Sequence, residues 1–176
     1  FPIAEDKRVH LPVMICQDGF ITSHGVENIL LVEDEKVKEL VGEYEPEHFL
    51  LNQKEKMAVG PYAVSNYYME TKRSQRQAME NAREVILEMA EKFEKLTGRK
   101  YGFFEEYCME DAEYVVVIIG SAAGTCKAAI EKLRAEDKKV GLLKIRVFRP
   151  FPEKELGEAL KDRKAVAVLD RSEMFA

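Results

Sequence analysis

The feature that most constrains the fold is a six-residue apolar run at 114–119 that leads directly into a glycine-bounded turn at 120–125. A continuous apolar run bounded by turn signals is typical of a strand that is buried on both faces. An amphipathic stretch at 126–134 follows, and then a second apolar run at 140–148. This order predicts a βαβ unit in which the two apolar runs lie side by side in a parallel sheet.

Other segments extend this prediction in both directions. Apolar residues recur at spacings of three and four between positions 79 and 96, which predicts an amphipathic helix over residues 69–97. Pro152 favours the start of a further helix after the βαβ unit, and the run at 165–169 predicts a third strand. Residues 11–16 form a shorter apolar run with a proline near its start, where a strand tolerates one.

Composition and charge exclude several classes of protein. Hydrophobic residues make up 46% of the 176 residues and charged residues 34%, which is typical of a globular chain and not of a disordered one. The net charge of −5 disfavours nucleic acid as a main partner, because binding phosphates needs a basic face. No apolar run reaches the roughly 18 residues that a membrane span requires.

The three cysteines, Cys16, Cys108 and Cys126, lie far apart and form no CxxC pair. We therefore expect neither an iron–sulfur cluster nor a zinc site built from the thiols of this chain alone. Unpaired cysteines are typical of a reducing compartment, so we expect a cytoplasmic location.

Two segments resemble one enzyme family. The first reads Leu-Pro-Val-Met-Ile-Cys-Gln-Asp-Gly-Phe-Ile-Thr-Ser-His over residues 11–24. The second reads Asp-Ala-Glu-Tyr-Val-Val-Val-Ile-Ile-Gly-Ser-Ala-Ala-Gly-Thr over 111–125, with Arg-Pro-Phe-Pro at 149–152 and Val-Leu-Asp-Arg at 168–171. Together they resemble the α subunits of the 2-oxoacid:ferredoxin oxidoreductases, the family that includes pyruvate:ferredoxin oxidoreductase.

The resemblance implies an α/β fold in three parts. Residues 1–36 would be the tail of a pyrimidine-binding domain, including a remnant strand of that α/β domain. Residues 37–112 would be a connector that contains the long helix 69–97. Residues 113–176 would be an incomplete transketolase C-terminal-like domain, in which helical layers cover a parallel sheet. On this interpretation the chain is a fragment of a longer subunit.

The resemblance also implies a function. The pyruvate-oxidising members convert pyruvate, coenzyme A and oxidised ferredoxin into acetyl-coenzyme A, carbon dioxide and reduced ferredoxin. Thiamine diphosphate, Mg and iron–sulfur clusters are implied for the full hetero-oligomeric complex of anaerobic metabolism, and none is expected on this segment. The resemblance transfers no catalytic residue here, so we expect a structural and assembly role beside the thiamine-binding and iron–sulfur subunits, and no activity of the chain alone.

Two alternatives remain open on the sequence. One is a stand-alone α/β module that binds a nucleotide at the glycine-bounded turn. The other is a segment of a different thiamine diphosphate enzyme, either transketolase-like or specific for a branched-chain 2-oxoacid.

The glycine-bounded turn is the candidate site for an anion. Its candidate residues precede a predicted helix, and the free N–H groups and the dipole at the start of a helix favour negative charge. These residues are Gly120, Ser121, Gly124 and Thr125. The turn lacks the Gly-x-Gly-x-x-Gly pattern and any Lys-Ser/Thr ending. A tight strand-to-helix turn, with Ser121 or Thr125 assisting the cap of the helix, is therefore the favoured explanation of these residues, and an anion site is the alternative.

Asp18, Ser23 and His24 suggest hydrolase chemistry at first sight. A nucleophile and a base adjacent in sequence rarely face each other, however, and catalytic triads are recognised by spatial geometry. We expect these residues to hold the end of the 11–16 run against the next domain, and a place near the cofactor edge is the alternative. Asp170 and Arg171 follow the third predicted strand, where we expect an interdomain or intersubunit contact, with a local ion pair as the alternative.

Lys72, Arg73 and Arg76 stand near the start of the long predicted helix. Cations at that end oppose the helix dipole. The pattern hints at an acidic neighbour, but a solvated face is the favoured explanation.

Overall fold

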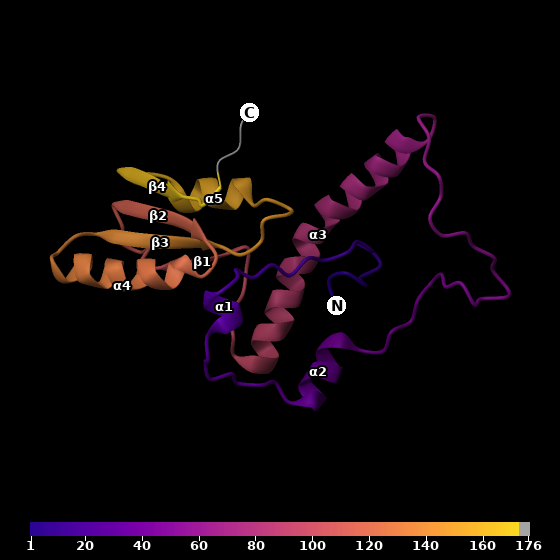
Figure 1. The fold of residues 1–176 in the computed structure, drawn as a ribbon, viewed down its shortest axis with the longest axis horizontal. Coiled ribbons are helices and arrows are strands. Elements are labelled where there is room, and N and C mark those ends of the chain that lie inside the picture. The colour runs from indigo at the N-terminus through magenta and orange to yellow at the C-terminus, as the bar shows by residue number, and fades with distance from the viewer. Residues whose placement is uncertain (173–176) are drawn as a thin grey trace. The chain divides into compact units, whose positions relative to one another are not determined.

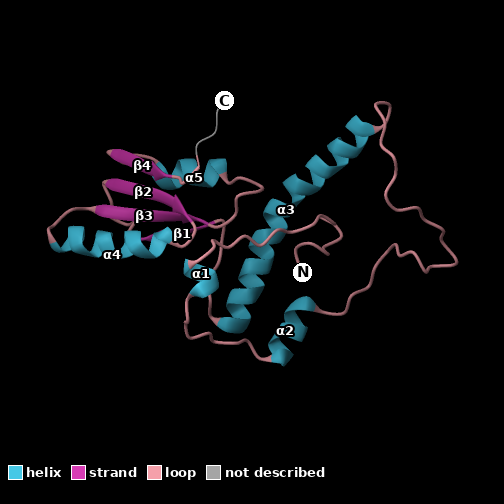
Figure 2. Ribbon diagram, viewed as in Figure 1, coloured by secondary structure: helices cyan, strands magenta, loops and turns pink. Residues whose placement is uncertain are grey.

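Residues 1–172 are described here from a computed structural model of the chain, shown in Figures 1 and 2. The chain divides into two compact units, one of Phe1–Val13 with Leu30–Gly98 and one of Met14–Ile29 with Arg99–Ala176. The helices are α1 (Ile21–His24), α2 (Asp34–Val41), α3 (Tyr68–Thr97), α4 (Ala122–Ala135) and α5 (Glu153–Leu160), and the strands are β1 (Phe104–Tyr107), β2 (Tyr114–Ile119), β3 (Val140–Ile145) and β4 (Ala165–Leu169).

The sheet of the second unit has the strand order β1-β3-β2-β4. β2 pairs in parallel with β3, with Val117 opposite Leu143, and in parallel with β4, with Val117 opposite Val168. The predicted βαβ unit and the third strand are therefore confirmed. The parallel pairing also brings the carboxyl ends of β2, β3 and β4 to one edge of the sheet.

Each face of the sheet carries its own apolar cluster. Val115 and Val117 pack with Leu156 of α5, whereas Ile118 packs with Ile130 of α4. This division follows from the alternation of side chains along a strand. Figure 2 shows α4 and α5 on opposite sides of the sheet. Helices thus cover both faces, as expected for the three-layer arrangement.

β1 was not predicted from the sequence. It pairs antiparallel with β3 at the edge of the sheet, with Glu105 opposite Lys144. Two adjacent glutamates, Glu105 and Glu106, interrupt any apolar run in this segment. An edge strand is solvated on one side and tolerates such charges, so its sequence lacks the pattern that marks β2.

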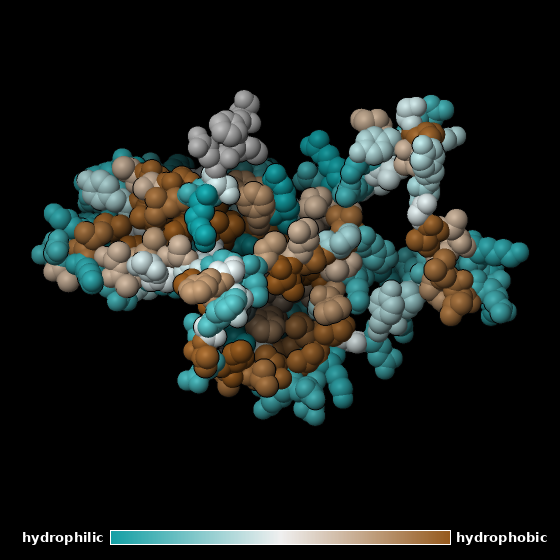
Figure 3. Space-filling view, in the orientation of Figure 1, coloured by the Kyte–Doolittle hydropathy of each residue, from teal (hydrophilic) through white to brown (hydrophobic). Residues whose placement is uncertain are grey.

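The predicted strand at 11–16 is wrong. These residues form no strand, and the side chains of Met14 and Ile15 are 85% and 91% exposed. A strand persists only where a neighbouring strand completes its backbone hydrogen bonds, and no residue among 1–172 does so here. Figure 3 shows apolar side chains at the surface around the chain between α1 and α2.

The long predicted helix is confirmed. α3 has 30 residues and ends at Gly98, which is left-handed (φ 73°) and donates its N–H to the carbonyl of Glu94 at 2.7 Å. Ala82 and Val85 are buried against Val9, so the apolar stripe covers part of the N-terminal segment. None of the helices in the described residues is long and apolar enough to cross a membrane.

Arg8 joins the N-terminal segment to α3 by polar contacts. Its guanidinium donates to both carboxylate oxygens of Glu88, at 2.9 and 2.6 Å, and also to Asp6. The side-chain amide of Asn81 donates to the carbonyl of Arg8 at 2.9 Å. These bonds fix the register in which Val9 meets the helix.

Candidate functional site

The turn between β2 and α4 lies at the carboxyl edge of the sheet and contains the sequence-predicted residues Gly120 and Ser121. Gly120 has a φ of +82°, a conformation that L side chains rarely adopt. Ser121 is the residue before α4, but its side chain makes no capping bond to the helix. Its hydroxyl donates instead to the carboxylate of Asp18, which lies 103 residues earlier.

Helix α4 starts earlier than the sequence suggested. It begins at Ala122, so Gly124 and Thr125 lie in its first turns and not in the loop, and both are exposed. The side chain of Thr125 has no hydrogen-bond partner within residues 1–172. The loop that joins β2 to α4 is therefore only two residues long, Gly120 and Ser121.

Asp18 is held on both oxygens. The hydroxyl of Thr22 donates to one carboxylate oxygen at 2.9 Å, and Ser121 donates to the other. The carboxylate lies beside the amino end of α4, where the helix dipole stabilises negative charge. A phosphate arriving at this turn would meet that negative charge, so the arrangement disfavours an anion site.

Ser23 and His24 do face each other, contrary to the expectation for adjacent residues. The Oγ of Ser23 and the Nδ1 of His24 are 2.7 Å apart, and Ser23 also accepts the backbone N–H of Phe20 at 2.9 Å. The ring of His24 stacks on Phe20 with centroids 5.6 Å apart. Within residues 1–172, no hydrogen bond joins Asp18 to His24, so the three do not form a triad.

Asp170 and Arg171 follow β4 at the same edge of the sheet. Asp170 accepts the backbone N–H of Ser172 at 2.9 Å, which closes a local turn. Over the described part of the chain, Asp170 and Arg171 form no ion pair with each other. Both side chains are exposed and remain candidates for an interdomain contact.

Sequence reasoning missed a charge network beside this edge. Glu105 of β1 accepts from Lys127 of α4 and, at 2.9 Å, from Arg146, which follows β3. The hydrogen bond from Lys127 is the main cause that lowers the pKa of Glu105 below its ordinary value. The guanidinium of Arg146 also lies 4.5 Å from the centroid of the Tyr101 ring. The three charges are far apart in sequence, so no spacing reveals the network.

Arg134 forms hydrogen bonds at the opposite end of the sheet, where β2 and β3 begin. Its guanidinium donates to the carbonyls of Val140 and Cys108, at 2.7 and 2.6 Å, and to Asp111 at 2.7 Å. One side chain at the carboxyl end of α4 thereby ties the start of β3 to the loop between β1 and β2. The hydrogen bond to Asp111 raises the pKa of Arg134 above its ordinary value.

Tyr107 of β1 donates its hydroxyl to Glu131 of α4 at 2.8 Å. This bond favours the neutral phenol and raises the pKa of Tyr107 to about 12. No group of three or more His, Cys, Asp or Glu within residues 1–172 is placed to hold a metal ion.

Two family descriptions match the chain. One, "Pyruvate flavodoxin/ferredoxin oxidoreductase, thiamine diP-bdg", covers residues 1–91, and the other, "Pyruvate:ferredoxin oxidoreductase core domain II", covers residues 112–176. Asp18 lies in the first match and Ser121 in the second.

Curated relatives agree with these matches. Pyruvate synthase subunit PorA of Thermotoga maritima is 50% identical over 98% of this chain and 44% of its own length. The PorA subunit of Methanocaldococcus jannaschii is 44% identical over 98% of this chain and 45% of its own length. The alpha subunit of the NADH-dependent phenylglyoxylate dehydrogenase of Aromatoleum evansii is 36% identical over 99% of this chain and 44% of its own length.

Among solved structures, a 2-oxoglutarate:ferredoxin oxidoreductase from Magnetococcus marinus is similar with a TM-score of 0.42 and 19% identity, over 61% of this chain and 16% of that one. This chain spans less than half the length of the curated relatives described above. The first family description covers more than half of the chain, and the resemblance found in the sequence is confirmed. The chain belongs to the pyruvate flavodoxin/ferredoxin oxidoreductase family.

Proposed function

We propose that the chain is a structural part of the α subunit of a pyruvate:ferredoxin oxidoreductase. The assembled enzyme would convert pyruvate, coenzyme A and oxidised ferredoxin into acetyl-coenzyme A, carbon dioxide and reduced ferredoxin. Thiamine diphosphate, Mg and iron–sulfur clusters would belong to the whole complex, with the thiamine-binding and iron–sulfur subunits as partners. The support is the similarity to PorA subunits over almost the whole chain.

The contact between Ser121 and Asp18 is the observation that carries the structural role. It joins the segment matched by the thiamine-binding description to the segment matched by core domain II. Gly120 and Ser121 follow a strand that is buried between two helical layers, so the position of their backbone is well defined by the sheet. The loop 14–29 contributes little apolar packing of its own, because its large hydrophobic side chains are exposed. The polar contact therefore sets where this loop lies.

The polar side chains near this edge bond to one another, which suits positioning better than chemistry. Asp18 is bonded to Thr22 and Ser121, and Glu105 to Lys127 and Arg146. We assign no catalytic residue and no cofactor ligand to this chain. Its three cysteines are free, which supports a cytoplasmic location.

The relative from the NADH-dependent phenylglyoxylate dehydrogenase, 36% identical, indicates that similar chains also belong to enzymes with another substrate and acceptor. The higher identity to PorA favours pyruvate among the 2-oxoacids. A stand-alone nucleotide module is less favoured, because Asp18 occupies the amino end of α4 where a phosphate would bind.

The test uses the enzyme assembled with its thiamine-binding and iron–sulfur subunits. Asp18→Asn removes the charge from the contact with Ser121, and Glu27→Gln, which removes an exposed carboxylate from the same loop, is the matched control. We expect Asp18→Asn to lower pyruvate-dependent ferredoxin reduction severalfold, or to release the subunit on size-exclusion chromatography, and the control to do neither. Equal behaviour of the two variants would contradict the positioning role. Failure of the unaltered chain to assemble with those subunits would contradict the proposed function itself.

A further inference from the structure

The amino-terminal turns of α3 carry a concentration of positive charge in a chain whose net charge is −5. Lys72, Arg73 and Arg76 lie in these turns, and Glu70 is the single acidic residue of the first turn. Cations at the amino end of a helix are disfavoured by the helix dipole. Their presence therefore works against the stability of the helix that bears them.

The structure gives these cations little compensation. Lys72 donates to the neutral side chain of Gln75 at 2.8 Å, and the Nε of Arg76 is 3.8 Å from a carboxylate oxygen of Glu80. Arg73 makes no hydrogen bond or ion pair with any residue of the described range 1–172. By contrast, Arg8 bonds to the carboxylate of Glu88 at 2.6 Å and Arg134 to that of Asp111 at 2.7 Å.

Apolar side chains flank the same turns. Tyr67 is 67% exposed and Met69 is 71% exposed, and every residue from 61 to 77 is exposed. An open pocket lies on these turns, and the residues that line it are Met69, Glu70, Lys72, Arg73 and Arg76. The surface thus combines weakly compensated cations with apolar area, a combination that polypeptide interfaces use.

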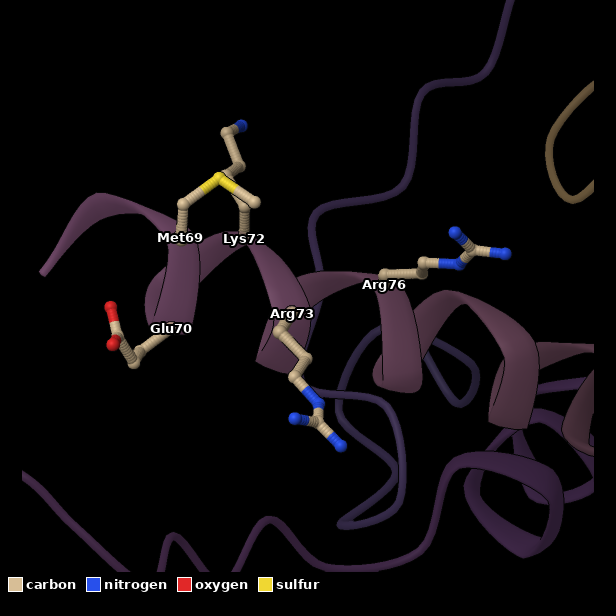
Figure 4. Close-up of a pocket in the computed structure, with 5 residues that line it drawn as sticks. All are labelled: Met69, Glu70, Lys72, Arg73 and Arg76. Carbon is tan, nitrogen blue, oxygen red and sulfur yellow. The ribbon is translucent and has the colours of Figure 1, made fainter.

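Figure 4 shows how the side chains that line this pocket are directed. Lys72, Arg73 and Arg76 point away from the helix in three different directions and do not converge on one point. A small anion would contact only one of them at a time. An extended partner with several carboxylates would reach all three.

We propose that the first three turns of α3 are a docking surface for an acidic segment of another polypeptide. The carboxylates of that segment would lie against Lys72, Arg73 and Arg76, and its apolar side chains against Tyr67 and Met69. Charge complementarity is the argument for this occupant. Nucleic acid fits less well, because three cations in an otherwise acidic chain offer no continuous basic track along a phosphate backbone.

The test is fluorescence anisotropy with a labelled twelve-residue peptide of alternating glutamate and leucine, at low salt and at about 0.3 M salt, where exposed charges are screened. Its glutamine–leucine counterpart and a twelve-nucleotide single-stranded DNA serve as comparison probes. We expect the acidic peptide to bind, the salt to weaken its binding, and the two comparison probes to bind at least tenfold more weakly.

The variant replaces Lys72, Arg73 and Arg76 with glutamine, and the matched control replaces Lys92, Lys95 and Lys100 with glutamine. Both change the net charge by the same amount. We expect at least a tenfold loss of affinity for the acidic peptide in the first and less than a twofold loss in the second. The first variant should keep its helix content by circular dichroism, because it removes cations that oppose the dipole.

Three outcomes would overturn the proposal. The first is absence of binding of the acidic peptide to the unaltered chain. The second is an equal loss of affinity in the two triple variants, which would mean that only net charge matters. The third is tighter binding of the DNA, which would make the patch a nucleic-acid site.

Discussion

At the scale of single residues, Gly141 of β3 is closely confined by three neighbouring atoms. A Cβ atom built there would lie 2.8 Å from the carbonyl oxygen of Cys108, and 2.9 Å from both the Cβ of Ala112 and the Sδ of Met109. Backbone cannot yield as a flexible side chain does, so the close approach of β3 to the β1–β2 loop requires glycine.

Gly141→Ala should therefore destabilise the chain by about 1–3 kcal/mol, as overpacking in a dense core does. Gly124→Ala is the matched control, since Gly124 lies in helix α4 and a Cβ added there would meet no atom within 4 Å. Alanine in a helix is favoured over glycine by about 0.5–1 kcal/mol, so the control should be neutral or stabilising. Thermal unfolding followed by circular dichroism measures both, and a control that loses as much stability as Gly141→Ala would refute the explanation.

At the scale of elements, the sequence predicts the helices and strands that bury an apolar face and misses the strand whose side chains are partly solvated. The apolar runs at β2 and β3 and the stripe of α3 predict those elements, because burial on both faces or along one stripe leaves a regular pattern. β1 has no such pattern, since it is an edge strand whose two middle residues are charged, with Glu105 half-buried and Glu106 exposed. The run at 11–16 has the apolar composition of a strand, but composition alone does not supply a neighbouring strand.

In the candidate site, too, the sequence predicts the part that adjoins a buried strand and does not predict contacts between distant segments. The turn at Gly120 and Ser121 was predicted because it adjoins a buried strand. Its partner Asp18 was identified separately as an interdomain candidate, but the pairing of the two depends on how the chain folds back over 103 residues. The bond between Ser23 and His24 was likewise hidden, because it depends on the backbone of α1.

The contacts of Glu105 with Lys127 and Arg146 should make the attachment of β1 sensitive to acid. Since the pKa of Glu105 is lowered in the folded chain, its contribution is present above the ordinary value of 4.5 and is lost as the pH falls through the lowered value. Denaturant unfolding at pH 7 and at pH 3 should show that Glu105→Gln costs about 1 kcal/mol at pH 7 and much less at pH 3. An equal cost at both values of pH would show that the charge of Glu105 is not involved.

Arg8 should control how firmly the N-terminal segment is held on α3. Arg8→Met removes the hydrogen bonds to Glu88 and Asp6 while keeping a long apolar side chain. We expect the amides of Val9 and His10, which are bonded to the carbonyl of Asp6, to exchange hydrogen severalfold faster. Lys95→Met is the control, because the Lys95–Glu91 pair lies within α3 alone. Unchanged exchange in Arg8→Met would show that the apolar contact of Val9 suffices.

At the scale of the whole molecule, the chain consists of two compact units, and in each of them a polar contact holds a loop or terminal segment in place. In the first unit Arg8 holds an N-terminal segment against a long helix, and in the second unit Ser121 holds the Asp18 loop against a sheet edge. The charged side chains in these contacts are bonded, Arg8 to Glu88 and Asp6, and Asp18 to the hydroxyls of Thr22 and Ser121. Contacts of this kind are compatible with the positioning role that we propose for the chain in a pyruvate:ferredoxin oxidoreductase.

The most direct test of that role compares the purified chain with the assembled enzyme in one assay, the reduction of ferredoxin that depends on pyruvate and coenzyme A. Our account predicts no turnover by the chain alone and turnover when the chain is bound in a complex with the thiamine-binding and iron–sulfur subunits. Turnover by the chain in the absence of those subunits would contradict it.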